Sequence, residues 1–118
     1  MKFDIKEITI NEEKFPCLCD INAIETIQNR WGLSTLRQGI TKHGEYNLTE
    51  LADLVSVLTT EACEVNEVEP IELDEIKYNI LGSANWADIF EQVVDVINTS
   101  MQSAKNAKTA QAKNQTRK

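Results

Sequence analysis

The sequence predicts a mainly α-helical protein with a small β-hairpin at its N-terminus. The chain of 118 residues has only 4 glycines and 2 prolines, too few for the frequent turns of an all-β domain. Apolar residues recur at spacings of three and four along most of the chain, whereas period-two alternation is confined to residues 1–20. We expect one domain, a hairpin packed on a bundle of about five helices, over residues 1–101. A flexible basic tail is expected over residues 102–118, where large apolar side chains are almost absent.

The predicted hairpin is built from apolar positions that alternate on both sides of a polar turn at residues 11–14. These positions are Ile8, Ile10, Phe15, Cys17 and Cys19. Pro16 falls on the opposite face, which is typical of an edge strand. The apolar phase changes from odd to even positions near residues 6–7, and this change predicts a bulge or a break in the strand there. Two strands alone are barely stable, so the hairpin is expected to pack on helices.

Five helices are expected after the hairpin, most of them with a recognisable start or stop. The predicted N-caps are Asp20 or Asn22, then Ser34, Asn47 and Ser83. Gly32 and Gly82 are the predicted stops of the first and fourth helices. The third helix, over residues 48–62, has Glu50 three positions after its cap, which is the spacing of a capping box. The fourth helix is expected over residues 73–81.

The last helix has the widest apolar surface. Its apolar side chains, from Trp86 to Met101, cover an arc of about 160° on a helical wheel. It is therefore either a central helix buried on two sides or a helix with one apolar face left for a protein partner. In the second case the partner-binding residues would be Trp86, Ile89, Phe90, Val93, Val96 and Ile97. The best-buried residues of the core are expected to be Leu51, Val55, Leu58, Phe90, Val93 and Ile97.

The net charge of −7 is unevenly distributed along the chain. Residues 1–100 hold all 19 acidic side chains and 7 basic ones, a net charge of −12, whereas residues 101–118 hold five basic side chains and no acidic one. An acidic body repels the phosphates of nucleic acids, which argues against nucleic acid as the partner of the main domain. The alternative that the basic C-terminal tail acts as an arm that binds nucleic acid stays open.

The sequence contains no pattern that supports catalysis, a cofactor or a metal. It has no phosphate loop, dinucleotide-binding fingerprint or nucleophile elbow. Cys17, Cys19, Cys63 and His43 could supply four zinc ligands, but the Cys-x-Cys spacing is tighter than usual, and small buried hydrophobic side chains are the favoured interpretation of the thiols. His43 is expected in a solvated loop at residues 43–45.

The segment at the N-terminus does not resemble a signal peptide, because Asp4 and Glu7 interrupt it. No apolar run is long enough to span a membrane. Three cysteines, an odd number, are typical of reduced thiols in a reducing compartment. We therefore expect a cytoplasmic protein.

Four features carry a family resemblance: the strand–turn–strand opening at residues 8–15, the first helical segment at residues 20–28, the leucine-rich helix at residues 47–62 with its acidic link, and the polar C-terminal end after an amphipathic helix. In this layout, residues 5–101 resemble the phage tail assembly chaperone family. The turn at residues 11–14 departs from the family, which often has a glycine there.

The resemblance implies a non-enzymatic role in the assembly of long phage tails. Proteins of this family bind the tape-measure protein, a long helical chain, and help to recruit tail-tube subunits around it. In that family a ribosomal frameshift can extend some copies past the normal C-terminus. Two alternatives stay open: an acidic regulatory or inhibitor protein that mimics DNA, which the charge of −12 favours, and a small helical enzyme or metal protein.

Overall fold

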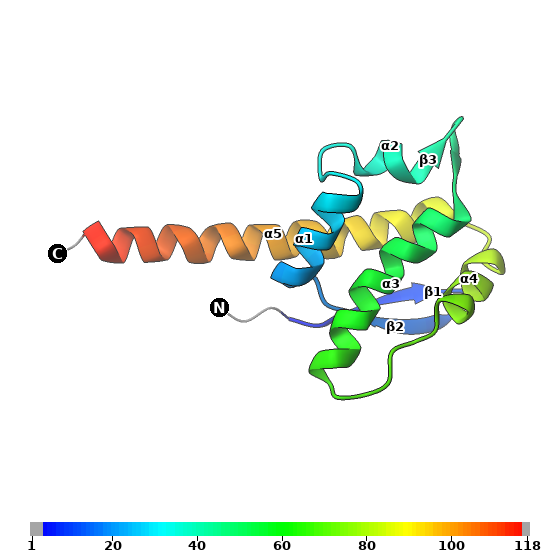
Figure 1. Cartoon of the computed structure of the whole chain (residues 1–118), viewed down its shortest axis with the longest axis horizontal. Helices are drawn as coiled ribbons and strands as arrows, with labels where there is room; N and C mark the ends of the chain where they lie inside the picture. Colours follow the sequence, from blue (N-terminus) through cyan, green and yellow to red (C-terminus); the bar gives the residue numbers. More distant parts are fainter. Residues whose placement is uncertain (1–3, 117–118) are drawn as a thin grey trace.

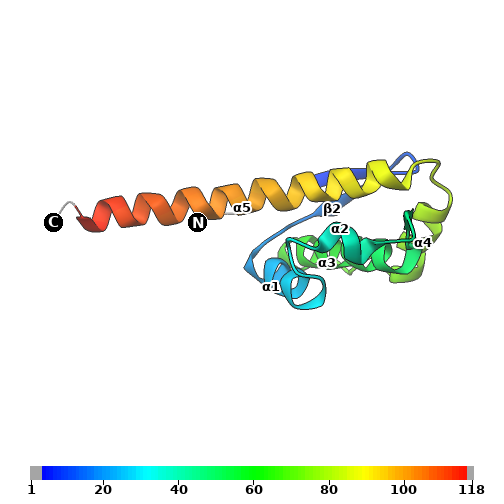
Figure 2. The same cartoon turned by 90° about the horizontal axis from the view of Figure 1, so that it is seen from above.

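The computed structural model describes residues 4–116, with side chains described up to Gln102. Within this part of the chain it has five helices and an N-terminal hairpin, which confirms the predicted mainly α fold. The elements are β1 (Lys6–Ile10), β2 (Glu13–Cys17), α1 (Ile21–Arg30), α2 (Leu36–Ile40), β3 (Thr41–Lys42), β4 (Glu45–Tyr46), α3 (Leu48–Val65), α4 (Leu73–Leu81) and α5 (Trp86–Thr116). Figure 2 shows two layers: α5 and the β1–β2 hairpin form one, and α1 to α4 form the other.

The β1–β2 hairpin turns through two residues rather than four. Asn11 and Glu12 have φ values of 51° and 69°, the left-handed conformation of a type I′ turn, whose twist matches that of the flanking strands. The register runs unbroken from Lys6↔Cys17 to Ile10↔Glu13. Of the bulge or break expected near residues 6–7, the bulge is therefore wrong. Strand β1 begins at Lys6, so the phase changes where the strand starts.

The loop expected at residues 43–45 is the tip of a second, very short hairpin. Strands β3 and β4 pair Thr41 with Tyr46 and Lys42 with Glu45. His43 and the following glycine form its two-residue turn, with φ values of 55° and 80°. Strands of two residues are too short to produce an alternation pattern, which explains why the sequence does not reveal them.

Two of the predicted helix starts have the expected cap. Asp20 accepts a hydrogen bond from the N–H of Ala23 at 2.9 Å at the start of α1, which decides between Asp20 and Asn22. Asn47 accepts one from the N–H of Glu50 at 3.1 Å at the start of α3. Helix α1 ends at Arg30 with Trp31 as its C-cap, and Gly32, the predicted stop, follows in the left-handed conformation with a φ of 75°.

Two other predicted caps are wrong. Helix α2 follows Thr35, not Ser34, and Thr35 makes no side-chain capping bond. Helix α5 is capped by Asn85, whose side-chain oxygen accepts a hydrogen bond from the N–H of Asp88 at 3.0 Å. Ser83 lies too far ahead of the first helical residue, so Asn85, directly before that residue, takes this role.

The hydrophobic core joins the hairpin to α3 and α5. All six residues predicted to be best buried have exposed fractions of 4% or less, which confirms that prediction. Ile8, Ile10 and Phe15 of the hairpin belong to the same core cluster, so the hairpin packs on helices as expected. The core cluster also takes in residues of α1, α2 and α4, so every layer of the fold contributes to it.

Helix α5 is longer than the sequence indicates. It was expected to end near Met101, but its backbone continues to Thr116, and Figure 1 shows this C-terminal part leaving the body of the protein. Alanine, lysine and glutamine favour helix, and no glycine or proline follows Gly82. The flexible tail was predicted for residues 102–118. The side chains of residues 103–118 lie outside the described part, so the flexible tail stays a prediction.

Candidate functional site

The stripe predicted to bind a partner lies mostly inside the protein. Ile89, Phe90, Val93, Val96 and Ile97 have exposed fractions of 6% or less, and Trp86 is half-buried. These residues therefore do not form a continuous exposed surface, and their binding of a partner stays a prediction. The β1–β2 hairpin covers one side of α5, whereas the other side lines a groove.

The β1–β2 hairpin covers the first side of α5. The side chain of Gln92 contacts the backbone of Thr9 in β1, with two hydrogen bonds of 2.9 Å. Ile89 and Val96 are three and four residues from Gln92, so they lie on the same side of the helix. This half of the apolar arc belongs to the core, because Ile89 is 1% and Val96 is 6% exposed.

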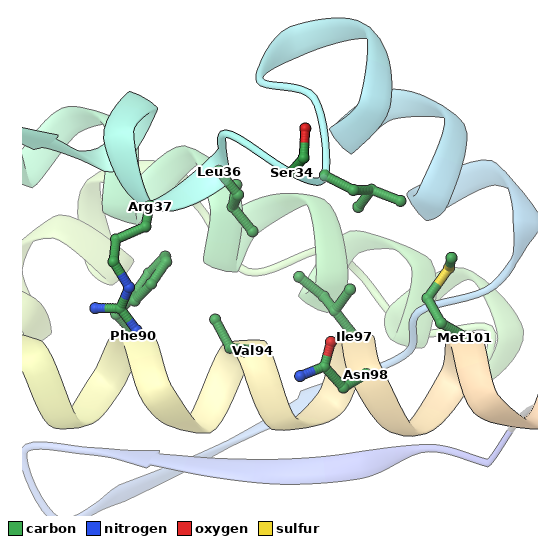
Figure 3. A pocket seen from close by; sticks show the side chains of 9 residues that line it. Ser34, Leu36, Arg37, Phe90, Val94, Ile97, Asn98 and Met101 are labelled. Carbon is green, nitrogen blue, oxygen red and sulfur yellow. The ribbon is translucent and has the colours of Figure 1, made fainter.

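An apolar groove follows the second side of α5 (Figure 3), where α2 and the loop before it form the opposite wall. Its volume is about 300 Å³. The α5 wall consists of Phe90, Val94, Ile97, Asn98 and Met101. The opposite wall consists of Leu33, Ser34, Leu36 and Arg37. Phe90 and Ile97 are thus the two predicted binding residues that the structure brings to a hollow on the surface.

The α5 wall could have been found from its spacing. Phe90, Val94, Ile97 and Met101 follow one another at steps of four, three and four residues, which places them in one row along the helix. Exposure does not rise steadily along this row: Phe90 and Ile97 are buried, Val94 is half-buried and Met101 is 38% exposed. Of the two ends of the row, the Phe90 end is therefore closed and the Met101 end is open to solvent.

Arg37 joins the two walls at the closed end of the groove. Its guanidinium forms an ion pair with Glu91 of α5 and donates a hydrogen bond to the Tyr46 hydroxyl at 3.2 Å. It also lies over the Phe90 ring, 5.0 Å from the ring centre, a cation–π distance. The hydrogen bond and charge of Glu91 raise the pKa of Arg37 further, so the cation is permanent.

The wall formed by α2 is held in place by Trp31. The Trp31 indole N–H donates to the Glu50 carboxylate in α3 at 2.8 Å, and the Trp31 carbonyl accepts from the Thr35 hydroxyl at 2.6 Å. The Glu50 carboxylate therefore accepts the indole N–H of Trp31 instead of the backbone N–H of Asn47, which a capping box would require. Gly39 of α2 lies against the indole so closely that an added Cβ would be 2.7 Å from Trp31 Cδ1.

The groove differs in charge from the rest of the body. Arg37 is charged, and no described residue that lines the groove is acidic. Ser34 and Asn98 are exposed polar residues at its margin. Since Arg37 is paired with Glu91 beside the groove, this is an apolar surface with a border of no net charge, in a body with a net charge of −12.

The three cysteines and His43, considered above as zinc ligands, do not come together as a metal site. Cys17, Cys19 and Cys63 are buried free thiols. Burial, with smaller contributions from Cys19 and Cys63, raises the pKa of Cys17 to about 12. His43 lies exposed at the tip of the β3–β4 hairpin. Within the described part of the chain, no group of three or more histidine, cysteine or acidic side chains could hold a metal ion.

Comparison of the chain with protein-family models, with curated proteins and with solved structures finds no match. Among the described residues, no helix combines the length and apolar character that crossing a membrane requires.

Proposed function

We propose that this protein is a non-enzymatic assembly chaperone that holds an amphipathic helix of a larger partner in the groove beside α5. The resemblance of residues 5–101 to phage tail assembly chaperones suggests the partner: a tape-measure protein, with tail-tube subunits recruited around it in the cytoplasm of the host cell. The observation that carries the proposal is the open apolar groove, because a helical partner needs an uncovered apolar surface.

The groove has the dimensions of a helix-binding site. From Phe90 to Met101 the α5 wall is about 16 Å long, or about three helical turns. A volume of about 300 Å³ lies at the lower end of the range for ligand pockets, about 300–1,000 Å³. An amphipathic helix that offers apolar residues at i, i+3 or i+4 and i+7 would lay them into such a groove.

The acidic body suits a chaperone. A net charge of −12 on residues 1–100 opposes self-association and keeps the complex dispersed. A long apolar partner chain aggregates when its amphipathic helices are free. Covering one helix at a time would delay this aggregation until the partner is assembled.

Co-expression tests the proposal. The gene for this chain is expected next to a tail-tube gene and a very long tape-measure gene, whose product is the candidate partner. With the chaperone present, the partner should stay in the soluble fraction and be recovered with it in a pull-down. If the partner is equally soluble alone and no complex is recovered, the proposal is wrong.

A pair of charge variants on α5 tests the groove itself. Met101→Asp places a carboxylate at the open end of the groove and should abolish the complex. Thr99→Asp adds the same charge to the same helix at an exposed position outside the groove and should leave the complex intact. If Thr99→Asp and Met101→Asp behave alike while both variants fold, the partner binds elsewhere.

A second candidate function is an acidic inhibitor that mimics DNA. The observation in its favour is the number of exposed carboxylates in the segment from the end of α3 into α4, although they are scattered and not arrayed in rows. These residues are Glu64, Glu67, Glu69, Glu72, Asp74 and Glu75. Salt-sensitive competition with DNA for a basic protein would favour this function, and its absence would favour the chaperone.

A further inference from the structure

Helix α4 has large apolar side chains on two opposite sides, and only one of these sides faces the core. Ile76 and Ile80 are fully buried, whereas Tyr78 is 76% exposed and Leu81 is 63% exposed. Tyr78 and Leu81 are three residues apart, so they are neighbours on the same side of the helix. Figures 1 and 2 both place α4 at the edge of the body, at the end opposite to the projecting part of α5. This apolar pair therefore faces solvent at a distance from the groove.

Asp74 continues the exposed side of α4 toward its N-terminus. It lies four residues before Tyr78, and side chains at this spacing are neighbours on a helix surface. Helical side chains lean toward the N-terminus, which brings the Tyr78 ring toward the turn of Asp74. A carboxylate in the first turn also stabilises a helix through its dipole, but the dipole does not account for an exposed tyrosine and leucine. We call Asp74, Tyr78 and Leu81 the outer face of α4.

The surroundings of the outer face are acidic. Glu72, directly before α4, is exposed at one end. At the other end lies the β1–β2 turn with Glu12, because Asn11 Nδ2 would be only 3.0 Å from a Cβ added to Gly82. Within the described part of the chain no ion pair engages these carboxylates, and Lys77 is the only cation of α4. A second copy of this chain would bring like charges together here, so the charge favours a basic partner.

We propose that the outer face of α4 binds a basic segment of another protein, through an arginine next to a large apolar side chain. A guanidinium can pair with the Asp74 carboxylate through two parallel hydrogen bonds and also lie on the face of the Tyr78 ring. The ammonium of lysine lacks the planar donor geometry that this double contact requires. The apolar side chain of the partner covers Leu81. This surface lies outside the groove, so the proposal does not depend on the proposed function.

Chemical-shift mapping with three synthetic peptides tests the proposal. The peptides differ only in the residue beside each leucine, which is arginine, lysine or glutamate. Added to the isotope-labelled full chain, the arginine peptide should shift the amide signals of residues 72–82. It should bind about threefold more tightly than the lysine peptide, and the glutamate peptide should not bind. Equal affinity for all three peptides would overturn the proposal. So would shifts of residues 72–82 on dilution of the chain alone, because a second copy would then be the occupant.

Substitutions at exposed positions separate the outer face from the general acidity of the chain. Tyr78→Ser and Leu81→Ser should each weaken the arginine peptide about threefold or more, whereas Val68→Ser, at a residue that is 56% exposed, should not. Asp74→Asn should weaken binding and reduce the preference for arginine over lysine. Glu69→Gln removes the same charge from an exposed position and should have a smaller effect, which salt abolishes. Equal effects of Asp74→Asn and Glu69→Gln would show non-specific attraction and contradict the proposal.

The groove variant Met101→Asp distinguishes this surface from the groove. It should leave the affinity of the arginine peptide unchanged, because Met101 lines the groove and α4 does not. If Met101→Asp abolishes peptide binding, the peptide occupies the groove and the proposal for α4 is wrong. If the arginine peptide binds as expected but co-expression has no effect on the tape-measure partner, the α4 surface stands and the chaperone function fails.

Discussion

The side-chain amide of Gln92 in α5 pairs with both backbone polar groups of Thr9 in β1. The Thr9 N–H donates to Gln92 Oε1, and Gln92 Nε2 donates to the Thr9 carbonyl, both at 2.9 Å. In the hairpin, Thr9 of β1 faces Lys14 of β2 as a non-hydrogen-bonded pair. The N–H and carbonyl groups of Thr9 therefore point away from β2. Gln92 thus takes the place of a third strand and protects an edge that could otherwise pair with another chain.

Removing this amide should loosen the contact between the hairpin and α5. Gln92→Ala is expected to lower the free energy of unfolding by about 1–2 kcal/mol, because each of the two hydrogen bonds contributes about 0.5–1.5 kcal/mol. Urea denaturation measures the loss, and hydrogen exchange at the Thr9 amide should become faster. Gln28→Ala, at an exposed position of α1, is the matched control and should change stability by less than about 0.5 kcal/mol. Unchanged exchange at Thr9 would contradict the pairing.

The core prediction can be tested with two leucines of opposite exposure. Leu58 is fully buried at the centre of α3, whereas Leu81 at the end of α4 is 63% exposed. Leu58→Ala should cost about 2–5 kcal/mol, because it removes apolar contacts and leaves a cavity. Leu81→Ala should cost less than about 0.5 kcal/mol. A loss below about 1 kcal/mol for Leu58→Ala would show that the buried face of α3 is wrongly assigned.

Local sequence signals predict much of this fold. The apolar period of α3 is unbroken from Leu51 to Ala62, and its cap at Asn47 lies directly before it, so both are visible within a few turns of chain. The same holds for Asp20 at the start of α1 and for the left-handed Gly32 after its end. Such features depend on neighbours in sequence, which a single sequence supplies.

The groove depends on contacts between residues far apart in the chain. The width of the apolar arc on α5 is visible in the sequence, but the division of this arc into a covered and an open half is not. The covering contact joins Thr9 to Gln92, which are 83 residues apart. The opposite wall is attached by Arg37 and Glu91, which are 54 residues apart. No period or local motif encodes pairings at such distances, so Leu33, Leu36 and Arg37 could not be recognised as site residues.

The cysteine thiols are expected to be unreactive in the native protein. Burial raises the pKa of Cys17 to about 12 and that of Cys19 to about 11; at Cys19 a hydrogen bond with Ser100 acts in the opposite direction and the charge of Asp20 adds to the rise. Cys63 is buried as well. Because the thiolate is the reactive form, a disulfide reagent at pH 8 should react within minutes with none of them. In denaturant all three should react.

Rapid reaction of a thiol in the native state would contradict this burial. Metal analysis gives an independent check on Cys17, Cys19 and Cys63: protein purified without added metal should contain far less than one equivalent of zinc. Stoichiometric zinc would require thiolates, which the raised pKa values of Cys17 and Cys19 oppose.

The stability of the fold should depend on the protonation of Glu61. Glu61 of α3 hydrogen-bonds with Asp20, the residue that caps α1. Burial raises the pKa of Glu61 to about 7, and the hydrogen bond and charge of Asp20 and the charge of Glu64 contribute to this. In the unfolded chain the pKa returns to its ordinary value of 4.5. The folded state therefore binds a proton more tightly than the unfolded state between these two values.

The sign of the effect follows from this difference. The contribution of protonated Glu61 to stability is complete below pH 4.5 and is lost as the pH rises through about 7. Glu61→Gln replaces the protonated carboxyl by a neutral amide that can still donate to Asp20. Relative to the wild type, this variant should gain stability between pH 5 and pH 8, as measured by urea denaturation at each pH. Glu25→Gln, an exposed carboxylate of α1, removes the same charge and is the matched control. If the difference between wild type and Glu61→Gln is the same at pH 5 and pH 8, the two carboxyl groups do not share a proton in the folded protein.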